Sequence, residues 1–516
     1  MHMKCFFLFL ACFGLAFGEF SQPHLETLYR SLDPESIAQL FAFYHLYPET
    51  PLGEKALASA WELMHKHRSE RLLLKGNMVL PAMKIDSIIS LVNKEAFETD
   101  IELSEDQLEI IETVSDHLAN RKLKGHTIWK KEDLIGLSPE EIDLSRALLL
   151  HQFEEDPSKV RQYEAMLDLI ALQILAKLPL EATEREKIEA MSHFIFHEKR
   201  FRFPPHSIYA KDIDTYTFLS NVLDSHLGVC LGVSILYLSI AERLDVSLEI
   251  ITPPGHIYLR HRCGGETLNI ETTARGIHVP DRMYLGINTR KLQQRNKKEV
   301  IGLAFINQAS VAWQKEDHLA AVKLYKEALP YLPEDPLLKM FLGYNYLFTG
   351  KEKEGKTLLK EIKDLTFDFA VGRETTPEDY LLGRVNAEGI KTIFLHVDET
   401  RSSILEKQEK LKAILKKYPK FRDGQLQLAI TYLQLGRGSE ALQALQAYHE
   451  LDPTSPVVEY YLSIVSMNRF LYKEAWDFLH RAEVLTNKRS HTPQCLKGLR
   501  HTLRTFYPDP DDKISL

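Results

Sequence analysis

Three residues near the middle of the chain are of the types that build a cysteine nucleophile: Cys230, His256 and Glu271. The thiolate is the nucleophilic form of cysteine, and the N–H groups and positive dipole end at a helix start stabilise it. The same N–H groups can hold a developing oxyanion. An imidazole can activate the thiol, and a carboxylate can orient the imidazole and stabilise its protonated form. The three residues therefore follow the logic of a Cys–His–acid triad.

A helix and a β-hairpin must position these residues. Residues 227–244 (LGVCLGVSILYLSIAERL) are apolar around most of a helical circumference, which predicts a buried helix with Cys230 at its start. Alternating apolar residues flank Gly264-Gly265, and this pattern predicts a hairpin. His256 is expected to open its first strand, and Glu271 lies on its second.

A two-residue turn at Gly264-Gly265 would set the register of that hairpin. Tyr258 then faces Glu271, and His256 faces Thr273. Directly opposed residues share a face of the sheet, and the strand period of two extends that face to every second residue. His256 and Glu271 become diagonal neighbours, about 7–8 Å apart at the backbone and within side-chain reach.

Each residue alone also has an ordinary structural interpretation. An apolar-flanked cysteine commonly packs in a core, and a lone histidine on a strand is commonly structural. The order of the three and their placement on a helix start and a hairpin favour the triad. Cys263 adjoins the turn and is interpreted as incidental. We predict no cofactor or metal. Four histidines are candidate metal ligands, but their spacing in the sequence is not that of a metal site: His193, His197, His206 and His226.

Small and aromatic residues recur at a 34-residue period after residue 302. The windows are 302–335, 336–369, 422–455 and 456–489, with Ala309, Ala321 and Tyr325 as examples from the first. Such residues let two antiparallel helices approach closely, and stacked copies bury their apolar faces together. The pattern resembles the tetratricopeptide repeat. Residues 370–403 break the register, residues 404–418 resume it, and residues 490–516 are expected to form a C-terminal tail.

The central segment resembles the transglutaminase-like cysteine superfamily. The resemblance is carried by GVCLGVSILYLSIAERL, PPGHIYLR and LNIETT, which correspond to Gly-x-Cys opening a helix, His beginning a strand and an acid before Thr. It implies that Cys230 is the nucleophile, His256 the general base and Glu271 the orienting acid. Glu271 stands where the superfamily usually has Asp, and Thr272 where it often has Pro. The combination with tetratricopeptide repeats resembles the SirB-type branch, whose members often lack the Cys.

The N-terminus is typical of an export signal. MHMK is followed by the uncharged apolar run CFFLFLACFGLAF and by Ala16-Phe17-Gly18, so residues 1–18 are predicted to be a signal peptide. The apolar run is shorter than the roughly 20 residues that span a bilayer, although anchoring through this segment stays open. We expect a bacterial protein that is periplasmic or secreted, with no membrane span in the mature chain.

The remaining sequence bounds the partners and the architecture. The chain has 516 residues, with 44% hydrophobic, 26% charged and a formal net charge of -8, so no basic surplus points to nucleic acid. Residues 19–184 contain three capping boxes, which begin at Ser104, Ser138 and Thr183. We expect an α+β fold: a helical region (19–184), a papain-like transglutaminase-like core (185–290) and an all-α repeat solenoid (302–369 and 404–489).

Two classes of function follow. The first is an exported cysteine peptidase or amidase, or an acyltransferase, that acts on protein amide bonds and binds a protein or peptide through its repeats. The second is a non-catalytic scaffold in which the repeats bind a partner and the transglutaminase-like domain is vestigial. The reactivity of the Cys230 thiol distinguishes the two, because an activated cysteine alkylates fast at neutral or mildly acidic pH.

Overall fold

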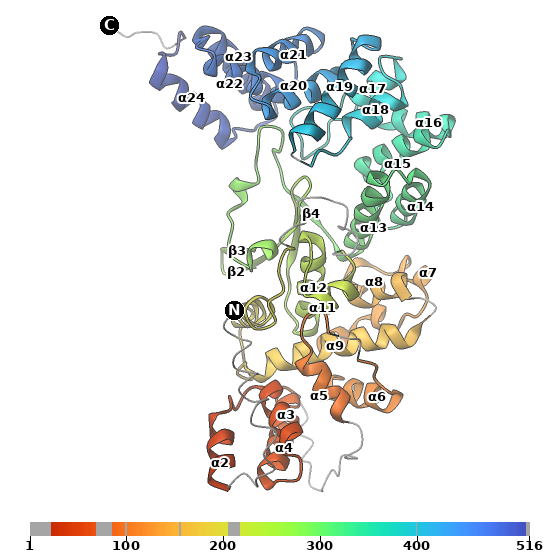
Figure 1. Ribbon diagram of the computed structural model, residues 1–516, viewed down its shortest axis with the longest axis vertical. Helices are drawn as coiled ribbons and strands as arrows, with labels where there is room; N and C mark the ends of the chain where they lie inside the picture. Colours follow the sequence, from red (N-terminus) through yellow and green to blue (C-terminus); the bar gives the residue numbers. More distant parts are fainter. Residues whose placement is uncertain are drawn as a thin grey trace.

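The computed structural model describes residues 22–68, 85–98, 101–153, 156–204, 217–398 and 400–511. The predicted signal peptide (1–18) lies outside these residues. Figure 1 shows helices at the N-terminal end, a small sheet with its surrounding helices in the middle, and an arc of helices toward the C-terminus. This confirms the predicted fold class, an α+β core between a helical region and an all-α solenoid. Every described helix is too short or too polar to cross a membrane.

The N-terminal region is helical, and its three predicted capping boxes are present. The box at Ser138 begins a 3-10 turn (Pro139–Glu141) instead of a longer helix. The helices are α2 (Gln22–Ser31), α3 (Ile37–Leu46), α4 (Pro51–Met64), α5 (Ile85–Asn93), α6 (Glu105–Val114), α7 (Lys131–Leu134), α8 (Leu144–Phe153) and α9 (Pro157–Ala176). The long helix α9 contacts α4, α6, α8 and α12, so it joins this region to the core.

In the core, a short antiparallel sheet packs against the buried helix α12. Its elements are α10 (Glu184–His193), α11 (Leu219–Ser225), α12 (Cys230–Arg243), β1 (Glu249–Thr252), β2 (Tyr258–Cys263), β3 (Glu266–Ile270) and β4 (Gln293–Arg295). The strand order is β3-β2-β1-β4. Leu259 pairs with Ile270 and Cys263 with Glu266, which confirms the predicted register at the Gly-Gly turn. The ladder ends at Leu259–Ile270, so the predicted pairs Tyr258–Glu271 and His256–Thr273 are not part of it. Gly264 and Gly265 have φ values of 56° and 87°, the left-handed conformation that a tight two-residue turn requires.

The C-terminal arc is a stack of helical hairpins. Its helices are α13 (Lys297–Gln314), α14 (His318–Ala328), α15 (Pro336–Phe348), α16 (Glu352–Ile362), α18 (Ala387–Ile393), α19 (Arg401–Lys417), α20 (Arg422–Gln434), α21 (Gly438–Leu451), α22 (Pro456–Asn468) and α23 (Tyr472–Asn487). Each of the four predicted 34-residue windows corresponds to one antiparallel pair, and neighbouring pairs contact one another. Ala309, Ala321, Tyr325 and Ala328 of the first window are fully buried, as the close approach of its two helices requires.

The structure contains helices in two segments where the sequence predicted an irregular connection (370–403) and a C-terminal tail (490–516). Residues 370–403 contain α17 (Thr376–Leu381) and α18, and α18 contacts α15, α19 and α20. It therefore takes the place of the first helix of a third hairpin. Residues 490–516 contain α24 (Gln494–Phe506). Its apolar residues recur at three- and four-residue spacing and are buried in a cluster with Trp476: Leu496, Leu499 and Leu503.

Candidate active site

Cys230 is the first residue of α12 and is partly buried. The residue before it, Val229, is the N-cap and has an aliphatic side chain that cannot cap the helix. The first-turn N–H groups have no intrahelical acceptor, so they and the dipole face the region of the thiol. Gly228 lets the incoming chain pass close to this turn, because a Cβ there would lie 3.1 Å from the backbone nitrogen of Val233.

His256 approaches from the other side, just before β2. The structure corrects the expectation that it opens the strand, since β2 begins at Tyr258. Pro253 and Pro254 have no N–H to give to a strand ladder, and Gly255 turns the chain with a φ of 73°. The Nε2 atom of His256 lies 2.7 Å from a carboxylate oxygen of Glu271. The turn thus aims the imidazole at the acid that the sequence predicted as its partner.

Glu271 follows β3, and both of its carboxylate oxygens are engaged. One oxygen accepts hydrogen bonds from the backbone N–H of Thr273 at 3.1 Å and from the Thr273 hydroxyl at 2.6 Å. The other accepts from His256 and from the hydroxyl of Tyr284. Burial raises the pKa of Glu271, but these donors outweigh burial and lower the pKa to about 2. The carboxylate is therefore charged and fixed in orientation at neutral pH.

His256 is held as an imidazolium by its neighbours. Burial lowers its pKa, but hydrogen bonding with Cys230 and Glu271 and the negative charges of both outweigh burial and raise the pKa to about 10. Because Nε2 faces Glu271, the other ring nitrogen is the one left for the thiol. The imidazole thus lies between the Glu271 carboxylate and the Cys230 side chain. The structure brings the three predicted residues together in the order of a triad.

Sequence reasoning missed two further contributions to the site. Tyr284 donates to Glu271, and its ring stacks on the imidazole of His256 with centroids 5.7 Å apart. The hydroxyls of Ser234, one turn after Cys230, and Thr272, next to Glu271, lie 3.0 Å apart in the core. Tyr284 sits in an irregular loop with no periodic pattern, so the sequence offers no signal for it. The contact between Ser234 and Thr272 links α12 to the turn that carries Glu271.

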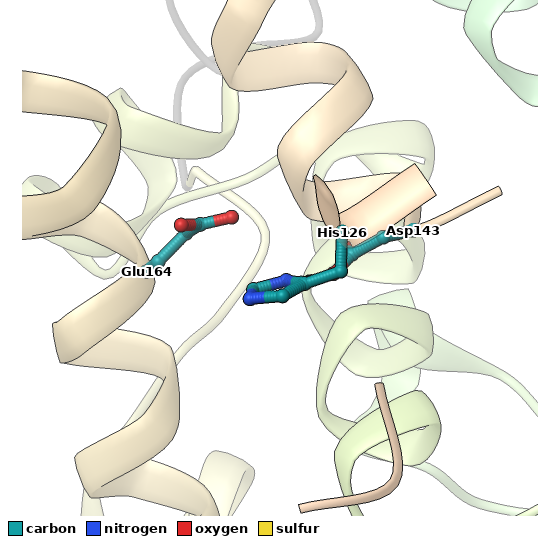
Figure 2. A group of neighbouring side chains, drawn as sticks. All are labelled: His126, Asp143 and Glu164. Atoms are coloured by element: carbon teal, nitrogen blue, oxygen red, sulfur yellow. Dashed lines mark hydrogen bonds and ion pairs between the residues drawn. The ribbon is translucent and has the colours of Figure 1, made fainter. Parts of the chain in front are cut away.

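Two other groups of side chains have the composition of metal ligands in the described part of the chain, and neither belongs to the triad. Figure 2 shows one of them, with His126 and Asp143 opposite Glu164 of α9. Glu164 forms two hydrogen bonds of 2.6 Å to the guanidinium of Arg146, and Asp143 accepts from Asn120 and bonds His126. These carboxylates already have cationic or polar partners, so the group is a buried ion-pair network.

The second group has a cationic partner as well. It consists of His480, Asp509 and Asp511, and the guanidinium of Arg500 is 2.5 Å from the Asp509 carboxylate. Of the histidines considered as metal ligands from the sequence, His193 and His197 stack on one helix surface and His226 stacks on Phe201. His206 lies outside the described residues. Cys263 is exposed at the hairpin turn, away from the triad.

Comparison with known families identifies the domain that contains these residues. Residues 161–299 match the family model described as the transglutaminase-like superfamily. This part of the chain is a transglutaminase-like domain, and it holds Cys230, His256 and Glu271. The match begins before the predicted boundary at residue 185 because it includes most of α9. No curated protein matches the chain. The SirB-type branch stays a prediction from the sequence.

Solved structures similar to the chain include tetratricopeptide proteins. TTC0263, a thermophilic TPR protein of Thermus thermophilus, is 18% identical with a TM-score of 0.20, and the match covers 40% of this chain and 97% of that one. MamA is 15% identical with a TM-score of 0.19, over 37% and 93%. MamA of Desulfovibrio magneticus RS-1 is 14% identical with a TM-score of 0.18, over 36% and 96%. The repeats of this chain are recognised from their own helix pairs.

Proposed function

We propose that the transglutaminase-like domain is a cysteine hydrolase that cleaves amide bonds in a protein or peptide bound by the repeats. The observation that supports this most directly is the contact of His256 with both Cys230 and Glu271, which holds an imidazolium beside the thiol. Burial alone would lower the pKa of a histidine, so the raised pKa of His256 reflects its contacts with Glu271 and Cys230.

The proposed reaction has two steps. The Cys230 thiolate attacks the carbonyl carbon of the amide, a C–S bond forms, and the first-turn N–H groups of α12 stabilise the oxyanion. His256 gives its proton to the leaving amine as the C–N bond breaks, which leaves an acyl group on Cys230. Water then attacks the thioester while His256 takes its proton, and the carboxylic acid and the Cys230 thiolate are released. If an amine takes the place of water, the same site transfers the acyl group.

Glu271 supports both steps without reacting. Its carboxylate keeps the imidazole in one orientation and stabilises the positive charge that His256 carries before it protonates the amine and again after it takes the proton of water. The extra methylene of Glu, compared with Asp, is accommodated because Thr273 and Tyr284 anchor the carboxylate where His256 reaches it. The substitution of Glu for Asp is therefore compatible with the proposed role.

The test is the pH dependence of iodoacetamide labelling in the folded mature chain, mapped by mass spectrometry. Cys263 is exposed and serves as the internal reference thiol. We expect Cys230 to label at pH 5–6 much faster than Cys263, and we expect the His256→Ala variant to lose this advantage. Slow labelling of Cys230 in both proteins would refute the activated pair, and the chain would then be a repeat-based binding protein.

Peptide libraries separate hydrolysis from acyl transfer once the thiol is shown to be reactive. Hydrolysis gives new carboxyl ends that incorporate ¹⁸O from labelled water, whereas transfer gives isopeptide or amide products when a primary amine is supplied. We expect ¹⁸O incorporation that depends on Cys230. Products formed solely with added amine would reassign the activity to an acyltransferase.

We also propose that the protein acts outside the cytoplasm of a bacterium, because residues 1–18 have the pattern of a signal peptide. Expression of the full chain in a bacterial host followed by fractionation tests this. A periplasmic or secreted product whose N-terminus is Glu19 is expected. A cytoplasmic product that retains Met1 would contradict export.

A further inference from the structure

Tyr284 contacts the triad in two ways. Its hydroxyl donates to the oxygen of Glu271 that also accepts from His256 Nε2. Its ring stacks with the ring of His256 and with that of Tyr258, with centroids at 5.7 Å and 4.7 Å and interplanar angles of 21° and 14°. The tyrosine therefore holds the carboxylate and covers the imidazole at the same time. A small displacement of this ring would loosen both partners.

The chain leaves the core directly after Tyr284. Residues 285–291, here named the docking loop, run to the C-terminal repeats and return to β4, as the light green trace between the core and the far end of the arc shows (Figure 1). The imidazole of His491 lies 2.8 Å from the carbonyl oxygen of Gly286. Ile287 packs against the apolar cluster around Trp476. The first half of the docking loop is thus fixed to the last repeat.

The second half of the docking loop pairs with the segment after α16. The carbonyl of Asn288 accepts from the backbone N–H of Val371 at 2.9 Å, and its side-chain oxygen accepts from Gly372 at 2.7 Å. The backbone N–H of Arg290 donates to Phe369 at 2.9 Å. The Arg290 guanidinium bonds the Asp368 carboxylate at 2.6 Å. Two segments of the solenoid that are far apart in the sequence, and that Arg489 joins through the carbonyls of Phe367 and Ala370, therefore hold one loop.

The covalent geometry makes this loop a short connection. A single residue, Leu285, separates Tyr284 from Gly286. A chain spans at most about 3.3–3.6 Å per residue, so these two positions are tied within roughly 7 Å of each other. When the repeats move relative to the core by more than the slack in this link, the docking loop must release the repeats or Tyr284 must leave Glu271.

We propose that Tyr284 is a positioning residue of the triad, and that the repeat solenoid sets its position through the docking loop. A protein seated on the repeats would then change the reactivity of Cys230 by changing the curvature of the solenoid. This inference rests on the proposed function, because it concerns the regulation of the same thiol. The docking loop would have two states, docked on the repeats or released from them. Contacts with the repeats and contacts of Tyr284 with Glu271 and His256 would both shift the equilibrium between these states.

The experiment compares variants far from the thiol by the rate constant of Cys230 alkylation across pH. Arg290→Ala removes the bonds of the guanidinium to Asp368 and to the Arg489 carbonyl, while Lys291 still pairs with Asp368. Asn288→Ala removes the bond from Gly372 and leaves Arg290 in place. Arg437→Ala is the matched control, since Arg437 pairs with Glu440 on α21 and does not touch the loop. We expect both loop variants to slow Cys230 at pH 6 by roughly two- to thirtyfold, and the control to leave the rate unchanged.

Tyr284 itself is tested by two substitutions. Tyr284→Phe keeps the stacked ring and removes one hydrogen-bond donor to Glu271. In a plot of the Cys230 alkylation rate against pH, the fall in rate on the acidic side should therefore occur at a higher pH. Tyr284→Leu removes ring and hydroxyl, and should slow labelling more than Tyr284→Phe. Thermal unfolding midpoints identify any variant that fails to fold, and two loop variants keep the test independent of one such failure.

The outcomes separate the inference from the proposed function. Fast, His256-dependent labelling that is equal in wild type, Arg290→Ala and Asn288→Ala would overturn the coupling and leave the catalytic proposal standing. Slow labelling of Cys230 in the wild-type protein would overturn both. Equal slowing in Arg437→Ala would also overturn the coupling, because the effect would then be a general one of the solenoid.

Discussion

The hydroxyls of Ser234 and Thr272 form a buried hydrogen bond of 3.0 Å that joins the helix beginning at Cys230 to the turn that carries Glu271. Ser234 lies one helical turn after Cys230, and Thr272 is the neighbour of Glu271. Both side chains are at most 1% exposed. The bond therefore constrains the separation of Cys230 and Glu271, which lie on two elements that are far apart in the sequence.

Ser234→Ala should weaken the fold and the site together. It leaves the Thr272 hydroxyl buried without this partner, which costs about 1–3 kcal/mol in the free energy of unfolding. Urea unfolding measures this cost, and Cys230 labelling measures the effect on the site. The double variant Ser234→Ala/Thr272→Val is the control, because removing both polar groups is expected to be close to neutral for stability. A double variant as unstable as the single one would show that the bond is not the cause.

Glu271→Gln should lower the pKa of His256. The amide keeps the size of the side chain and loses the negative charge, and an opposite charge at this distance raises a histidine pKa by roughly 1–3 pH units. We expect the imidazole, which titrates near pH 10 in the wild type, to titrate correspondingly lower. Histidine-selective NMR across pH measures this. An unchanged His256 pKa would mean that Cys230 alone holds the imidazolium.

The parts of the site that were predictable from sequence are those set by local rules. Two glycines in a tight turn determine the hairpin register, which brings the start of β2 beside the end of β3. His256, just before β2, therefore comes near Glu271, just after β3. The 34-residue period likewise predicts the helix pairs, because each repeat buries its small residues in the same way. Cys230 was predictable because an apolar helix begins immediately beside it.

The parts that were missed depend on contacts between distant segments. Tyr284 reaches Glu271 from a loop whose course is set by Asp368 and His491, and no local pattern encodes that course. The helix α18 was missed because its seven residues are too few for a clear period, and its position depends on packing against α15 and α20. His256 lies before β2 because Pro253 and Pro254 have no N–H for the ladder. The alternating apolar pattern predicts His256 on the strand when it is given more weight than these prolines.

Gly355→Ala should destabilise the second repeat. A Cβ at this position would lie 2.5 Å from a methyl of Leu347 and 2.9 Å from the carbonyl oxygen of Gly343, where α15 and α16 are closest. We expect a loss of about 1–3 kcal/mol in the free energy of unfolding, measured by urea denaturation. Gly438→Ala is the matched control, since nothing lies within 4 Å of its added Cβ. If both variants unfolded alike, close approach would not be the reason for glycine at 355.

Glu374→Gln should stabilise the solenoid at alkaline pH and have little effect at acidic pH. Burial, followed by the negative charge of Asp423, raises the pKa of Glu374 to about 7. The folded state therefore holds a proton that the unfolded state releases near pH 4.5. Stability from this group is fully present below about pH 4.5 and is lost as the pH rises through about 7. The amide cannot ionise, so the variant avoids this loss.

The raised pKa of Glu374 also sets the expected size of the change in the free energy of unfolding. We expect the variant to exceed the wild type by roughly 1–3 kcal/mol at pH 8, with the difference vanishing near pH 4. Urea unfolding at both pH values measures it. Glu409→Gln is the control, because Glu409 is an exposed residue of α19 paired with Lys412, and surface pairs contribute little. A gain for Glu374→Gln that is equal at pH 4 and pH 8 would contradict a titrating origin. Glu374 lies just before α17 and Asp423 lies on α20, so a pH-dependent difference would show that protonation of Glu374 stabilises this part of the solenoid.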